Sequence, residues 1–188
     1  MRIKRLFLIF GIITLIGCKK VEEKKPVNVE HEIAELKSLS DKEDYLEYIL
    51  ETDQNIRDGR SSEVFLKYGE NSSEYHNFNY IMDSIDQLNL KRIDIYLKTF
   101  GYPSVDSVSR NASIAPWIVI HHSTDVEQRK KYFNYLYNAY KDKNISSDYF
   151  EGYLGRTYQF QFGNYPSGEG AYNMDDKING LIKKLELE

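Results

Sequence analysis

Residues 114–122 have the sequence IAPWIVIHH, and this stretch decides the fold class of the chain. Its first seven residues are apolar on every side, which indicates a segment enclosed by its neighbours. A central helix is the prediction, and a buried β-strand is the alternative. The helix accommodates Pro116 only in its first turn, because proline lacks the backbone N–H that later turns require.

The chain before this stretch has the apolar spacing of helices. The predicted helices are residues 41–58, residues 73–87 and residues 89–100. Ser40 begins a capping-box pattern at the start of the first of them, and Asn89 is the predicted N-cap of the third. Gly101 and Pro103 end that third helix. Residues 104–110 fit either a short strand or an extended loop.

The chain after this stretch is also helical in pattern. The predicted helices are residues 124–140, residues 147–158 and a short helix from about residue 174. Thr124 begins a second capping-box pattern, and the glycines and proline between residues 160 and 173 predict a long loop. The predicted fold is therefore mainly α, with a single compact multi-helix domain over residues 40–188.

The first eighteen residues have the layout of a signal peptide. A start with three basic residues is followed by the apolar run 6–16. As a helix this run reaches about 16 Å, roughly half of the ~30 Å hydrocarbon core, so it is too short to remain as a membrane span. Gly17 before the chain's single cysteine resembles the bacterial lipobox. That resemblance implies cleavage before Cys18 and lipidation of its thiol.

These features divide the chain into three parts. The predicted signal peptide is residues 1–17, the lipidated Cys18 and a charged flexible tether occupy residues 18–39, and the helical domain follows. The prediction is a lipoprotein of the bacterial cell envelope, attached to the membrane by palmitate-type acyl chains on Cys18. With Lys19 rather than an aspartate after the cysteine, the chain resembles lipoproteins sent to the outer membrane, which implies a domain facing the periplasm or the cell surface.

The charge balance argues against nucleic acid as a partner. The chain has 25 Lys+Arg against 29 Asp+Glu, a net charge of -4. Removing residues 1–17 takes away three basic groups and no acidic ones, which leaves 22 against 29, a net charge of -7. A phosphate backbone is bound mainly by clustered basic side chains, so no nucleic acid is predicted as a partner.

Several short motifs resemble one bacterial family. They are DQNIR at 53–57, DQLN at 86–89, FGYP at 100–103, APWIVIHH at 115–122, and the pair Asp125 and Gln128. In these motifs the chain resembles the uncharacterised domain-of-unknown-function (DUF) family 6624 over residues 45–160, roughly. Tyr102 stands where tryptophan is usual in that family, and His121 where glutamine is usual. The resemblance implies a shared fold, and it implies no activity, because the family has none that is established.

The candidate polar site consists of Asp53, Arg57, His122 and Asp125. Asp53 and Arg57 lie one turn apart where an apolar helix face ends, so they fit either a structural ion pair or a receptor for a polar ligand. His122 ends the most apolar segment, three residues before Asp125, a spacing at which the carboxylate could orient the imidazole as a general base. The alternative is a structural histidine that caps a helix C-terminus.

Three functions are compatible with these residues, and whether the protein is an enzyme stays open. The first hypothesis is a binding or interaction module with an unknown envelope ligand or protein as its partner. The second is an envelope hydrolase that uses His122 as general base. The third is a glycan-binding domain that uses surface tyrosines, since nine of the 16 tyrosines lie between Tyr132 and Tyr172. No metal or cofactor is predicted, because zinc-ligand spacings and phosphate-binding glycine loops do not occur.

Overall fold

A computed structural model describes residues 27–167 and 173–187 of the chain. The predicted signal peptide, Cys18 and the start of the predicted tether lie outside these residues. The described residues form helices and connecting turns without a strand, so the predicted mainly α fold is confirmed. Within them, no helix has the length and apolar character needed to cross a bilayer.

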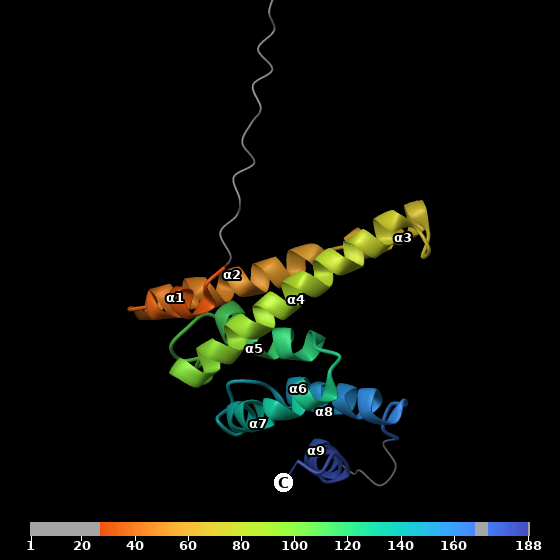
Figure 1. Cartoon of the computed structure of the whole chain (residues 1–188). Helices are drawn as coiled ribbons and strands as arrows, with labels where there is room; N and C mark the ends of the chain where they lie inside the picture. Colours follow the sequence, from red (N-terminus) through yellow and green to blue (C-terminus); the bar gives the residue numbers. More distant parts are fainter. Residues whose placement is uncertain (1–26, 168–172, 188) are drawn as a thin grey trace, which may run out of the picture.

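The described helices pack in layers within one domain (Figure 1). They are α1 (Val29–Ala34), α2 (Leu39–Arg57), α3 (Arg60–Tyr68), α4 (Ser73–Phe100), α5 (Arg110–His122), α6 (Val126–Lys131), α7 (Phe133–Lys141), α8 (Ser147–Phe162) and α9 (Met174–Lys184). In Figure 1, α1, α2 and α4 form one layer, α5 lies below it, and α6 to α8 lie below α5. The end that carries α3 extends beyond the lower layers.

The apolar stretch forms most of α5, at the centre of the domain. α5 contacts α2, α4 and α8, and Ala112, Ala115 and Ile120 have no exposed surface. The predicted central helix is therefore confirmed, and the β-strand alternative is wrong. The predicted place of Pro116 in the first turn is also wrong, because α5 already begins at Arg110.

α5 begins early because α2 helps to cap it. The Ser109 hydroxyl accepts a hydrogen bond from the Ala112 N–H at 3.2 Å. Glu43 of α2 accepts from the Ser109 N–H at 2.8 Å, and Glu47 accepts from the Ser109 hydroxyl. These partners satisfy backbone groups that a helix start leaves unpaired. The sequence left a short strand and an extended loop as alternatives for residues 104–110. Residues 104–109 form a turn rather than a strand.

α4 is a single helix of 28 residues where two helices were predicted. Asn89, the predicted N-cap, lies in its interior and is 1% exposed. The Asn89 amide donates to the Thr52 hydroxyl of α2 at 3.3 Å, and its oxygen accepts a long hydrogen bond, 3.4 Å, from Arg92. Since these partners satisfy the amide, the helix continues through a residue that commonly begins one.

Two predicted helix starts shift by one or two residues. Ser38, rather than Ser40, caps α2 in a capping box with Asp41. Asp125, rather than Thr124, caps α6. The predicted helix 124–140 is also interrupted, since Tyr132 separates α6 from α7.

The predicted tether is too long at its C-terminal end. Residues 29–34 fall within it, yet they form α1, with Val29 and Ile33 only 0% and 4% exposed in the core. Glu32 of α1 also accepts two hydrogen bonds, each 3.0 Å, from the buried guanidinium of Arg92. The predicted start of the domain at Ser40 is therefore wrong, and the domain includes α1.

Candidate functional site

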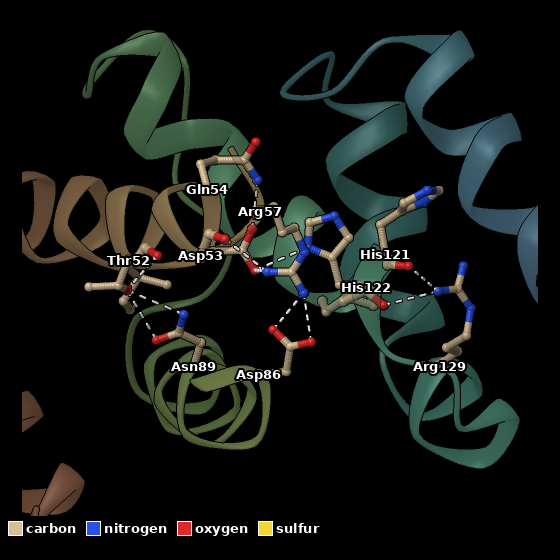
Figure 2. Close-up of polar contacts among 11 residues, drawn as sticks. Thr52, Asp53, Gln54, Arg57, Asp86, Asn89, His121, His122 and Arg129 are labelled. Atoms are coloured by element: carbon tan, nitrogen blue, oxygen red, sulfur yellow. Dashed lines mark hydrogen bonds and ion pairs between the residues drawn. The ribbon is translucent and has the colours of Figure 1, made fainter. Parts of the chain in front are cut away.

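Asp53 is the centre of a polar network where α2, α4 and α5 meet (Figure 2). It follows Ile49 by one turn on the buried face of α2 and is 1% exposed. Its Oδ1 lies 3.1 Å from Nη1 of Arg57 and 3.0 Å from Nδ1 of His122. Its Oδ2 accepts from the Gln54 amide at 2.6 Å. The structure thus brings together three of the four predicted site residues, namely Asp53, Arg57 and His122.

Arg57 joins α2 to α4. Its Nη2 lies 2.6 Å from each carboxylate oxygen of Asp86, and its Nη1 donates to the Asp53 carbonyl at 2.8 Å. Burial raises the pKa of Asp86, the Asp53 carboxylate raises it further, and Arg57 and His122 oppose both effects. Asp86 was missed as a site residue, because its partner lies 29 positions away in the sequence.

The His122 ring is held at one nitrogen and available at the other. Nδ1 faces the buried Asp53 carboxylate, whereas Nε2 has no partner among the described residues and is not enclosed. A carboxylate on one ring nitrogen fixes the orientation of the imidazole. The other nitrogen can then contact a ligand or a water molecule.

Asp125 does not orient His122, so this predicted pairing is wrong. α5 ends at His122, and the chain turns through Ser123 before Asp125 begins α6. The Asp125 carboxylate accepts from the Gln128 N–H at 3.1 Å and serves as the N-cap of α6. Asp53 takes the orienting role that was predicted for Asp125.

His121 is half-buried and lies outside the polar network, with its ring centroid 6.2 Å from that of His122 (Figure 2). Its ring stacks on Trp117 with 4.6 Å between centroids, and the Trp117 indole N–H donates to the Tyr149 carbonyl at 2.7 Å. Burial, assisted by the nearby charge of Arg129, lowers the pKa of His121 to about 3. The imidazole of His121 is therefore neutral near pH 7 and takes no part in the polar network.

His122 lines a cleft of about 400 Å³ between α4, the end of α5 and the start of α6. Asp83, Asp86 and Asp125 line this acidic cleft, whose described lining contains no lysine or arginine, and Arg57 pairs with Asp86 from outside the lining. The other lining residues are Gln87, Leu90, Val119, Ser123, Thr124 and Gln128. This volume is typical of small-ligand sites, and the carboxylates favour a ligand that carries positive charge.

A buried arginine of α6 holds the end of α5 from its other side. Arg129 has no exposed surface and donates to the carbonyls of Ile120, His121 and Ser123 at 2.8 to 3.1 Å. It also donates to the Tyr153 carbonyl and the Thr157 hydroxyl of α8, each at 2.8 Å. Carbonyls at a helix C-terminus carry partial negative charge, which favours a cation there.

Arg129 was missed at the sequence level, although the pattern contains a signal for it. It lies three residues after Val126 and four before Phe133, on the face that carries their apolar side chains. Burial lowers the pKa of Arg129 to about 10, so the guanidinium is charged near neutral pH. A charged residue inside an apolar helix stripe indicates a buried cation whose partners come from elsewhere in the fold.

The tyrosines after residue 131 mostly pack against the core. Tyr132 and Tyr153 are buried, and the partly buried ones are Tyr135, Tyr137, Tyr140, Tyr149 and Tyr158. Among the described tyrosines of this segment, only Tyr165 is largely exposed, at 63%. This arrangement gives little support to a tyrosine surface for glycans.

Nothing in the described part of the chain groups three or more His, Cys, Asp or Glu side chains as a metal ion requires. Comparisons with protein-family models, with curated proteins and with solved structures gave no match. The resemblance to DUF family 6624 therefore stays a prediction.

Proposed function

We propose that the protein is a lipid-anchored envelope protein whose domain binds a small cationic ligand, such as an amine, in the acidic cleft. The anchor rests on the sequence layout that ends at Cys18. The binding function rests on one observation, which is that three carboxylates line a cleft of ligand size beside His122. Because Arg57 already pairs with Asp86, an ammonium group would mainly offset the charges of Asp83 and Asp125.

Two of the three carboxylates are held in place by contacts of the fold. Arg57 holds Asp86 through both carboxylate oxygens, and the first turn of α6 holds Asp125 through the Gln128 N–H. Asp83 has no hydrogen-bond or ion-pair partner among the described residues and is exposed on α4. Asp83 can therefore be replaced without removing a contact of the polar network.

Alaninamide, which carries an ammonium and no carboxylate, is the probe for this function. We expect it to shift the backbone NMR signals of the cleft residues Ser123 and Gln128 in the purified full chain in detergent. Asp83→Asn should weaken its binding by up to about fivefold, the range of an exposed charge pair. Asp44→Asn, which changes another exposed aspartate, on α2 and outside the cleft, should leave binding unchanged. Equal binding by both variants would contradict the proposal.

The affinity for alaninamide should also depend on pH. Because the pKa of Asp86 is raised, this carboxylate is still partly protonated just above the ordinary aspartate range. Deprotonation creates the charge that an ammonium contacts, so affinity should rise as pH rises through this range and then level off. Titrations from about pH 4 to 7 measure this, and affinity that falls with pH would argue against carboxylate recognition.

The lipid anchor has its own test. Cys18→Ser removes the only thiol of the chain, so the variant should incorporate no labelled palmitate and should leave the membrane fraction. The wild-type chain, expressed in the same cells, is the control. Labelling of Cys18→Ser at the wild-type level would overturn the lipoprotein assignment.

Hydrolysis with His122 as general base is the second candidate function. The observation that favours it is the contact between Asp53 and Nδ1 of His122, which leaves Nε2 available to take a proton from water. Hydrolysis of an amide or ester substrate that is lost in His122→Ala, and retained in His121→Ala, would assign this function. Binding of alaninamide without turnover of any such substrate favours the binding function.

A further inference from the structure

We propose that the natural ligand is a short peptide with free ends, which lies along α4 with its ammonium among Asp83, Asp86 and Asp125 and its carboxylate near Lys91 and Lys131. This inference rests on the proposed function, because the acidic cleft is one half of the site. The other half is a second depression that continues the first along α4.

The two depressions share part of their lining. The second has a volume of about 310 Å³ and is lined by residues of α4, α6 and the turn that follows α6. Gln87, Leu90 and Gln128 line both depressions. The two therefore form one groove between α4 and α6, which we call the α4–α6 groove.

The far end of the α4–α6 groove carries the opposite charge. Lys91, Lys131 and Asp94 line it, and Lys91 also pairs with Glu30 of α1 at 3.1 Å. Asp94 lies 2.6 Å from Nζ of Lys131 and 2.6 Å from Nζ of Lys98, which is not part of the lining, so Asp94, Lys98 and Lys131 together have a net charge of +1. Against the effect of burial, hydrogen bonds from these lysines lower the pKa of Asp94. A ligand carboxylate at this end would meet an excess of positive charge.

The spacing of the charged ends gives the length of the ligand. Asp83 and Lys91 are eight residues apart on α4, which corresponds to about 12 Å along the axis. An extended peptide spans at most about 3.3 to 3.6 Å per residue, so three or four residues cover this distance. A single amino acid is too short to place its ammonium and its carboxylate at opposite ends of the groove.

The middle of the α4–α6 groove suits a peptide backbone. Leu90 supplies an apolar surface, and Gln87 and Gln128 supply side-chain amides on either side of it. Neither of these amides has a partner among the described residues. Amides both donate and accept, as the N–H and C=O groups of a peptide require.

Tetraalanine, N-acetyl-tetraalanine and tetraalanine amide test this inference with the full chain in detergent. We expect tetraalanine to bind most tightly, and removal of either terminal charge to weaken binding by about fivefold. Lys131→Gln should lose most of the preference for tetraalanine over its amide, because Lys91, the other lysine at this end, already pairs with Glu30. Lys141→Gln, an exposed lysine of α7 that also lies over a tyrosine ring, should keep the preference for the free carboxylate.

The outcomes separate this inference from the proposed function. If alaninamide binds and tetraalanine amide binds as tightly as tetraalanine, the acidic cleft is an amine site and the peptide inference is wrong. If Lys131→Gln keeps the preference as fully as Lys141→Gln does, or if both variants lose it alike, the far end of the groove is not the carboxylate site, and the inference is wrong as well. If alaninamide itself fails to bind, the proposed function is wrong, whatever the peptides do.

Discussion

Replacing Arg129 by alanine is expected to lower the free energy of unfolding by about 4 kcal/mol, since it adds a cavity to several unpaired buried acceptors. The guanidinium donates to four backbone carbonyls and to the Thr157 hydroxyl, and it has no exposed surface. Water cannot readily replace these donors at a site enclosed by α5, α6 and α8. Chemical denaturation of the full chain, followed by circular dichroism, measures the loss.

Two controls locate the effect at Arg129. Arg129→Lys keeps the charge but has a single nitrogen, which cannot reach acceptors on both α5 and α8, so we expect an intermediate loss. Arg110→Ala removes an exposed arginine of α5 and should change stability by no more than about 0.5 kcal/mol. If Arg129→Ala were as stable as Arg110→Ala, the buried guanidinium would contribute nothing to stability.

Asp53→Ala is expected to lower the free energy of unfolding by about 3 kcal/mol, because it removes a buried charge and leaves its partners behind. Arg57 retains Asp86, but His122 and Gln54 lose the carboxylate that they share. Asp44→Ala, an exposed position on the same helix, is the matched control. Denaturation of the two variants should therefore separate them clearly.

Asp53→Asn adds a second measurement that depends on the site rather than on stability alone. The amide keeps the shape of the side chain but removes the charge that holds Arg57 and orients His122. We expect weaker alaninamide binding than in the wild type, measured where both proteins are fully folded. Unchanged binding together with reduced stability would leave Asp53 a purely structural residue.

The sequence predicted the residues of the candidate site better than it predicted their partners. Asp53 and His122 were recognisable because each ends an apolar segment, where a buried polar side chain requires a hydrogen-bond partner. Their contact spans 69 positions and depends on how α2 packs on α5, which no local spacing encodes. Asp125 was chosen instead because it is close in sequence, whereas the turn at Ser123 directs it to the start of α6.

The fold shows the same division between local pattern and tertiary context. α5 and α9 were predictable because an apolar run and an N-cap are local features. Asn89 was predicted as an N-cap because asparagine is common there. Its actual partner, the Thr52 hydroxyl, belongs to another helix and is not visible in the local sequence. α1 was missed because six residues are too few to show a helical spacing of apolar side chains. Val29 and Ile33 stabilise this helix by packing in the core, which the local sequence does not show.

The end of α5 is held from two sides, and this has a consequence for the kinetics of ligand capture. Asp53 fixes the His122 ring on one side, while Arg129 binds the carbonyls of Ile120, His121 and Ser123 on the other. Because the end of α5 is already ordered before a ligand arrives, this side of the acidic cleft loses little conformational entropy on binding. Association should then occur in a single step, with an observed rate that increases linearly with ligand concentration and does not saturate.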